Sequence, residues 1–329
     1  MQIGLNLARK LIMSDTVFKA NFYKSLQFCR QQGMHLLSIN SKIENDRIGK
    51  FILDNGITFG HFWTSASNLA GDHEWIWLST GRNMYYTNWD QGEPNHAHNS
   101  TENCVEVRHW GSSGFTWNDL NCQENLFFIC ESITDCVQVF RSATLKFAPT
   151  QMMGSNLILI IGIFCSTCIV NVDPEEYLSA VLPARKTLNS FRYLGKVYYI
   201  NTVFQANFYT ALHFCRQQGM HLLSISNEAE NQKIGNMIKE KGYIGYRFWT
   251  SGTNLADKRK WVWSSTGNDV TFFKWAPGEP NNALENSENC LEAGWYKNEQ
   301  ALIWNDIRCS GIELQFICEA TTDCHNLHC

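Results

Sequence analysis

An internal repeat constrains the fold of this chain more than any other feature. Residues 28–39 recur without a change as residues 214–225. The same spacing of 186 residues separates Cys104 from Cys290, and it grows by one or two residues at the last repeated cysteines. A long, nearly constant offset indicates two copies of one domain and excludes a solenoid of short repeats. With 329 residues, each copy is long enough to bury a core of its own.

Each copy begins with helical periodicity and continues in short apolar runs. Phe22, Leu26 and Cys29 fall at helical spacing before Gly33, and a second amphipathic segment spans residues 43–53. Beyond Asn55-Gly56, short aromatic runs alternate with Gly, Asn and Asp, which is typical of short strands and long loops. The sequence therefore predicts an α+β unit with two helices and short antiparallel sheets.

The charge balance and the cysteines narrow the class of protein. Lys plus Arg is 27 against 31 Asp plus Glu, so the chain lacks the basic excess of a nucleic-acid binder. Four cysteines per copy repeat in register and allow three pairings. A zinc site would need a short Cys-x-x-Cys spacing, which these cysteines lack. We expect disulfides, and hence a secreted, extracellular protein. The repeated cysteines are Cys29, Cys104, Cys122 and Cys130, then Cys215, Cys290, Cys309 and Cys318.

Thirteen cysteines leave five outside these two frameworks. Cys136 and Cys324 are a further repeated pair, and they can bond to each other, to Cys329 or to another chain. A disulfide-linked oligomer and a non-covalent oligomer therefore both stay open.

An apolar run of 14 residues, 157–170, lies between the copies. It is too short to span a bilayer and has the length of the apolar part of a signal peptide, starting just after Met152 and Met153. We therefore expect a signal-like segment over 152–170 and no membrane insertion of the mature protein. A buried linker helix is the alternative. A redox motif at Cys165 and Cys168 carries less weight, because both lie inside the apolar run.

The amino terminus does not match the second copy. Residues 195–200 favour an aromatic, β-branched strand, whereas the equivalent residues 9–14 do not resemble them. We interpret the sequence as two neighbouring single-domain proteins joined in one chain, the first lacking its opening strand. The predicted organisation is an unmatched segment over 1–14, a domain over 15–136, a linker over 137–194, a domain over 195–324 and a tail over 325–329.

Two clusters of oxygen ligands recur in both copies. Each copy has a Glu-Pro-Asn motif, a distant Glu two residues before a cysteine, and a Trp-Asn-Asp motif. Carboxylates mixed with amide oxygens, with no thiolate or imidazole in register, suit Ca²⁺ better than zinc. A proline between two ligands can point both side chains the same way, especially in a cis bond. The alternative is that these are ordinary turns. The residues are Glu93, Asn95, Glu102, Asn118 and Asp119, then Glu279, Asn281, Glu288, Asn305 and Asp306.

These motifs, the four-cysteine frameworks and Trp75-Ile76-Trp77 resemble the C-type lectin domain over residues 15–131 and 195–319. The resemblance implies two C-type lectin-like domains with disulfides Cys29–Cys130, Cys104–Cys122, Cys215–Cys318 and Cys290–Cys309. It implies that each set of five residues binds one Ca²⁺. Two neighbouring sugar hydroxyls would bind the same ion and hydrogen-bond to the same side chains, Asp119 and Asp306 excepted. Glu-Pro-Asn resembles the mannose-type motif, whereas galactose-type members usually carry Gln-Pro-Asp. The tandem arrangement is similar to secreted insect lectins, which implies innate recognition of microbial or glycoprotein glycans.

The chain departs from the family at an accessory calcium site. The expected positions hold Asn68, Asp72 and His96 in the first copy and Asn254, Lys258 and Asn282 in the second, where a lysine argues against a further ion. Asn99 is in the single glycosylation sequon, within the first ligand loop.

Two other functions compete with sugar binding. One is a lectin-like domain that binds a protein partner and uses calcium only structurally. The other is a hydrolase, but the repeated His35 and His221 lie in an identical, largely apolar segment. No activated Ser or Cys accompanies them, so we do not expect an enzyme.

Overall fold

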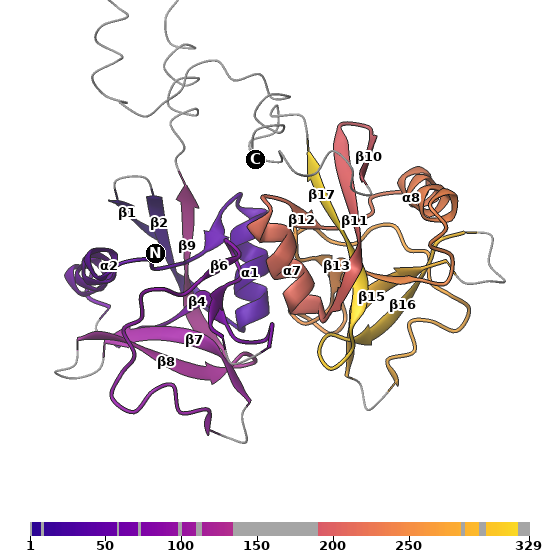
Figure 1. Cartoon of the computed structure of the whole chain (residues 1–329). Helices are drawn as coiled ribbons and strands as arrows, with labels where there is room; N and C mark the ends of the chain where they lie inside the picture. Colours follow the sequence, from indigo (N-terminus) through magenta and orange to yellow (C-terminus); the bar gives the residue numbers. More distant parts are fainter. Residues whose placement is uncertain are drawn as a thin grey trace, which may run out of the picture.

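The computed structural model describes residues 2–133 and 190–321, apart from short gaps at 8–9, 58, 72–73, 98–100, 110–113, 284–286 and 296–300. The described residues form two α+β domains of the same architecture, each with two helices and one sheet (Figure 1). The first domain contains β1 (Gln2–Leu7), β2 (Lys10–Ala20), α1 (Phe22–Gln31), β3 (His35–Leu36), α2 (Lys42–Asp54), β4 (His61–Ser67), β5 (Ile76–Trp77), β6 (Arg82–Asn83), β7 (Glu102–His109), β8 (Phe115–Asn121) and β9 (Leu126–Ile133).

The second domain repeats this order, except that none of its described strands corresponds to β6. It contains β10 (Ser190–Tyr193), β11 (Lys196–Ala206), α7 (Phe208–Gln217), β12 (His221–Leu222), α8 (Glu228–Glu240), β13 (Arg247–Thr253), β14 (Val262–Trp263), β15 (Glu288–Gly294), β16 (Ile303–Arg308) and β17 (Leu314–Thr321).

Each sheet is mixed rather than purely antiparallel. β2 pairs antiparallel with β9, but β9 runs parallel to β4, which in turn pairs antiparallel with β7. The second domain has the same parallel contact between β13 and β17. Sequence periodicity indicates strands but not their direction. Along the chain, β4 and β9 are separated by four further strands and long loops, so no hairpin forces them to be antiparallel.

The first domain does not lack its opening strand, contrary to the expectation for residues 1–14. β1 and β2 form a hairpin, and β2 pairs with β9 as β11 pairs with β17. Ile12 and Tyr198 occupy equivalent positions, opposite Glu131 and Glu319, and are both completely buried. Strand pairing uses backbone groups, so the same pairing forms although the sequences differ, provided that a large apolar side chain is buried at this position. In the second domain β10 begins at Ser190, inside the segment predicted to be linker.

Side-chain caps start the helices at the predicted places. Asn21 accepts a hydrogen bond from the Lys24 amide at 2.9 Å, and Asn207 does the same for α7 with Thr210. At α2, Ser41 caps the Glu44 amide, and the Glu44 carboxylate accepts from the amide of Asn40, one residue before the cap, in an arrangement close to a capping box. These caps fix where each helix enters the domain.

The core and the disulfides connect the helices to the sheet. Trp63, Trp117 and their counterparts Trp249 and Trp304 are completely buried. Cys29–Cys130 and Cys215–Cys318 join the first helix of each domain to its last strand. Cys104–Cys122 and Cys290–Cys309 join β7 and β15 to the residue just beyond β8 and β16. These are the pairings that the resemblance implies.

The segment of residues 152–170 and five cysteines lie outside the described residues: Cys136, Cys165, Cys168, Cys324 and Cys329. Among the residues that the structure does describe, no helix is both long and apolar enough to cross a bilayer.

Candidate functional site

The structure places the predicted ligands of each domain on three elements. Glu93 and Asn95 are in the connection between β6 and β7, Glu102 begins β7, and Asn118 and Asp119 are in β8. In the second domain the connection between β14 and β15, the start of β15 and strand β16 carry the equivalent residues. Both long connections lie along the lower edge of the molecule in Figure 1.

The aspartate of each Trp-Asn-Asp motif holds the Glu-Pro-Asn loop in place. The bond between Glu93 and Pro94 is cis, and so is its counterpart between Glu279 and Pro280. Asp119 accepts hydrogen bonds from the Asn95 amide at 3.1 Å and the His96 amide at 2.9 Å. Asp306 accepts the two equivalent bonds at 3.1 and 2.8 Å. Residues distant in sequence therefore meet in the same arrangement in both domains.

Acidic side chains crowd together at each loop. Burial, and then the neighbouring Asp119, raise the pKa of Glu93 above its ordinary value. The pKa of Glu279 is raised in the same way by burial and Asp306. A carboxylate pair of this kind is stabilised by a proton or a cation, because either removes the repulsion between like charges.

A third carboxylate in each domain has an unused oxygen. Oε2 of Glu102 and Oε2 of Glu288 are buried and have no hydrogen-bond partner among the described residues. Burial also raises the pKa of Glu288. A buried acceptor without a donor is unfavourable, and a bound cation satisfies it.

Sequence reasoning missed the residues that orient the asparagines. The Asn118 amide nitrogen donates to Glu106 at 3.0 Å, and that of Asn305 donates to Glu292 at 3.1 Å. With the nitrogen of Asn118 engaged in this way, its carbonyl oxygen points away from Glu106 and can accept or coordinate elsewhere. Glu106 is in turn held by His61 at 2.7 Å. Glu106 repeats as Glu292 at the offset of 186 residues, and this repetition is the sequence signal that could have identified the orienting glutamates.

The donors fit calcium in type, although they are not preassembled as a dense acidic cluster. Across the part of the chain that the structure describes, no group of three or more His, Cys, Asp or Glu side chains is gathered for a metal. The local set instead combines a carboxylate pair, the buried Glu102 oxygen and amide oxygens, all of them hard ligands. The residues present therefore match the chemistry that Ca²⁺ requires.

The two sites differ in several neighbouring side chains. His96 stacks on Trp75 with 6.0 Å between ring centroids and lies 3.3 Å from Asp119, whereas Asn282 stands at the equivalent place. At the expected accessory position of the second domain, the Lys258 ammonium donates to Asn289. Asp72 and Asn99 lie outside the described residues.

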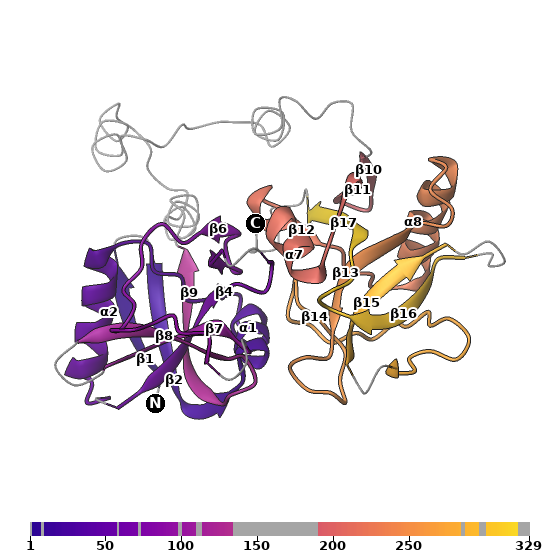
Figure 2. The same cartoon turned by 60° about the horizontal axis from the view of Figure 1, so that its bottom comes forward.

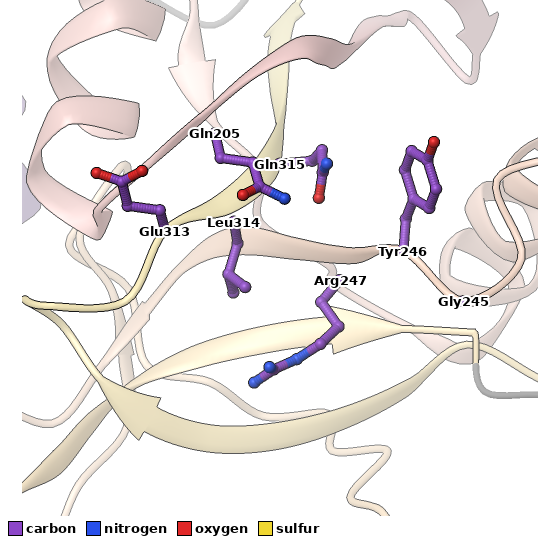
Figure 3. Close-up of a pocket in the computed structure, with 7 residues that line it drawn as sticks. All are labelled: Gln205, Gly245, Tyr246, Arg247, Glu313, Leu314 and Gln315. Carbon is purple, nitrogen blue, oxygen red and sulfur yellow. The ribbon is translucent and has the colours of Figure 1, made fainter.

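A separate groove of about 430 Å³ lies on the second domain between the ends of β11, β13 and β17 (Figure 3). Gln205, Arg247 and Glu313 line its polar part. Arg247 also donates to Glu292 at 2.7 Å, and Glu292 accepts from Asn305. The groove therefore connects to the asparagine of the site through one carboxylate.

The fold and the repeated loops define a tandem pair of lectin-type binding domains. The family model described as "Lectin C-type domain" matches residues 18–132 and 204–320. The chain belongs to the C-type lectin domain family.

Relatives are found both in small proteins and in a large receptor. The chain is 34% identical over 118 residues to the C-type lectin mosGCTL-7 of Aedes aegypti, an alignment that covers 34% of this chain and 77% of the relative. It is 33% identical over 129 residues to perlucin of Haliotis laevigata, covering 39% and 81%. It is 24% identical over 307 residues to human C-type mannose receptor 2, covering 91% of this chain but 17% of the receptor.

The chain is also similar to solved structures. The C-type lectin domain of murine dendritic cell inhibitory receptor 2, solved with an N-glycan, is 27% identical and covers 40% of this chain and 95% of its own. Its TM-score is 0.34.

Proposed function

We propose that each domain binds one Ca²⁺ and, through it, a mannose-type sugar. The observation that carries the proposal is the coincidence of three features in both domains. These are a cis Glu-Pro-Asn loop held by an aspartate, an asparagine amide turned by a buried glutamate, and a third glutamate with a buried, unpartnered oxygen. The proposed ligands are Glu93, Asn95, Glu102, Asn118 and Asp119, and Glu279, Asn281, Glu288, Asn305 and Asp306.

A bound Ca²⁺ would supply the positive charge that neutralises the carboxylates and attracts sugar hydroxyl oxygens. The protein side chains would orient the sugar through hydrogen bonds to its hydroxyls. A glutamate can only accept from one hydroxyl when ionised, whereas an asparagine amide can donate to the next. Because Glu precedes Asn in both loops, the order of acceptor and donor selects the hydroxyl geometry of the sugar. We assign mannose-type sugars on this order.

Sugar binding of this kind needs no chemical step, and we propose a non-enzymatic, secreted protein that recognises glycans on microbes or on glycoproteins. The disulfides favour an extracellular location. The similarity of the chain to a C-type mannose receptor supports glycan recognition.

Binding to immobilised mannose tests the proposal. We expect the purified chain to be retained in Ca²⁺, released by EDTA and restored when Ca²⁺ is added back. Replacing both motifs by Gln-Pro-Asp, through Glu93→Gln, Asn95→Asp, Glu279→Gln and Asn281→Asp, is expected to reduce mannose binding at least tenfold and to favour galactose. This follows because the swap reverses which position accepts and which donates.

Asn40→Asp and Glu240→Gln make the same chemical changes at exposed positions and serve as controls. Retention that EDTA does not affect contradicts calcium-dependent sugar binding. If the four-residue variant instead keeps a protein partner that the wild type captures, calcium serves only a structural role.

A further inference from the structure

The two domains contact each other through their first helices. α1 and α7 lie side by side at the centre of the molecule in two views (Figures 1 and 2). The hydroxyl of Tyr23 on α1 lies 3.3 Å from the hydroxyl of Tyr209 on α7. These tyrosines are separated by 186 residues, the offset of the repeat. The contact therefore joins a residue to its own counterpart.

Contacts on either side of the tyrosines are reciprocal. A Cβ atom added to Gly81 would lie 2.6 Å from the Cβ of Arg216, and one added to Gly267 would lie 2.8 Å from the Cβ of Arg30. Gly267 is the counterpart of Gly81, and Arg216 is the counterpart of Arg30. Each domain thus presents the same glycine turn to the same arginine of the other domain. That reciprocity is the defining property of a two-fold, isologous interface.

Polar contacts follow the same rule. Gln27 donates to the Gly267 carbonyl at 3.3 Å, and its counterpart His213 makes a hydrogen bond to the backbone of Gly81. Gln31 adds a bond to the Gly267 carbonyl at 3.0 Å.

A second group of contacts between the two domains is not reciprocal but enlarges the interface. Thr210 donates to the Ala70 carbonyl at 2.5 Å, and Asn207 donates to the same oxygen at 3.3 Å. Tyr23, Leu69 and Ala70 of the first domain pack against the apolar core cluster of the second.

Charged and phenolic groups at the interface are shielded from water. Burial lowers the pKa of Arg30 to about 10, and burial together with the charge of Arg30 lowers the pKa of Arg216. Burial raises the pKa of Tyr23 to about 12. Each guanidinium donates at 3.2 Å to a carbonyl of its own domain, Ser79 or Ser265. The arginines are thus held by their own domains, and the partner domain covers them.

We propose that the face formed by α1 and the Gly81 turn, and its counterpart formed by α7 and the Gly267 turn, is a docking surface between lectin domains. The partner of each domain is the other domain of this chain. The pair is held by the interface itself and stays assembled when the connection between residues 133 and 190 is cut. This interaction is independent of calcium and of sugar.

Cutting the connection in the assembled full chain tests the proposal. A site for a specific protease is inserted within residues 171–185, and Cys136, Cys324 and Cys329 are replaced by Ser so that no disulfide outside the frameworks links the halves. We expect the cut protein to elute as one species near 37.8 kDa and to separate in SDS without reductant. At about 1 µM protein, coelution requires a Kd in the micromolar range or below.

Two sets of variants test the surface. Gly81→Ala with Gly267→Ala puts methyl groups into the partner domain and is expected to raise the Kd of the cut pair at least tenfold. Gly56→Ala with Gly242→Ala is the matched control. Those glycines also have positive φ, 76° and 77°, but a Cβ there meets nothing within 4 Å. The control pair should stay associated.

Gln27→Glu with Gln31→Glu tests the same surface without glycine strain, because acceptors would then face the Gly267 carbonyl. We expect the same loss of association while both domains keep their native circular dichroism. The proposal is overturned if the cut wild-type chain separates into monomers, or if interface and control variants dissociate alike.

Discussion

At the scale of single residues, one buried ion cluster in the second domain tests how much charge pairing contributes. The Lys196 ammonium lies 2.8 Å from Glu230 and 3.0 Å from Glu319. Burial alone would lower the pKa of Lys196, but Glu319 and Glu230 outweigh it and raise the pKa. Burial raises the pKa of Glu319, whereas hydrogen bonds from Lys196 and Tyr198 outweigh burial at Glu230 and lower its pKa.

Lys196→Met is expected to lower the free energy of unfolding by about 3 kcal/mol at neutral pH, because two buried carboxylates lose their cation. Without it, burial raises the pKa of both carboxylates in the folded state above that in the unfolded state. The penalty should therefore shrink as the pH falls towards about 4 and the carboxylates are protonated. Denaturant unfolding from pH 7 to pH 4 measures this.

Lys42→Met is the matched control, since Lys42 pairs with Asp46 on an exposed turn of α2. We expect it to change the free energy of unfolding by less than about 0.5 kcal/mol at either pH. Equal losses for both variants, or a Lys196→Met penalty that grows in acid, contradict the account of the cluster.

At the scale of elements, the two disulfides of a domain have different tasks. Cys29–Cys130 closes a separation of 101 residues and joins α1 to β9, whereas Cys104–Cys122 closes 18 and joins β7 to the end of β8. Loop entropy predicts that losing the first costs about 4.7 kcal/mol and losing the second about 3 kcal/mol. We expect the free energies of unfolding of the paired Cys→Ala variants to follow that order.

Removing the two disulfides should affect calcium binding in the opposite order, with the shorter disulfide mattering more. Cys104→Ala with Cys122→Ala frees the strand ends that carry Glu102 and Asp119, so we expect it to raise the calcium concentration at half-saturation of the first domain several-fold. Cys29→Ala with Cys130→Ala should leave that midpoint unchanged where the domain is still folded. The untouched second domain of the same chain is an internal reference.

The sequence predicts some elements well and others not at all, and the reason is physical. Helices with caps and apolar spacing, such as Phe22–Gln31, carry their signal locally. β2 does not, because its pairing with β9 is made by backbone groups and its two buried described side chains, Ile12 and Ala20, lie eight residues apart. The parallel direction of β4 and β9 depends on contacts between distant segments.

The same distinction applies to the candidate site. Its proposed ligands could be found because they repeat as motifs, whereas Glu106 and Glu292 act through a hydrogen bond to another side chain. The interface between the domains leaves a still fainter trace in the sequence. Gly81 and Gly267 are repeated, but the sequence does not show why they are glycines. In the structure, a Cβ atom at either position would clash with an arginine of the other domain.

At the scale of the whole molecule, the paired domains carry both proposed sites along one edge (Figure 1). Two sites held on one side of a paired structure can engage two sugars of the same surface, and the second binding event then becomes intramolecular. We therefore expect the intact chain to bind densely mannosylated particles far more tightly than it binds free mannose.

Inactivating one site separates these two kinds of binding. Glu279→Gln with Asn281→Asp should halve the number of free-mannose sites in a titration without changing the affinity of the first domain. On a mannosylated surface the same variant should lose about 100-fold in apparent affinity, because the intramolecular step disappears. Gly81→Ala with Gly267→Ala should lose part of that gain while both sites stay active, since the domains are then joined only by their long connection. A surface affinity that falls merely twofold would mean that the two domains bind independently.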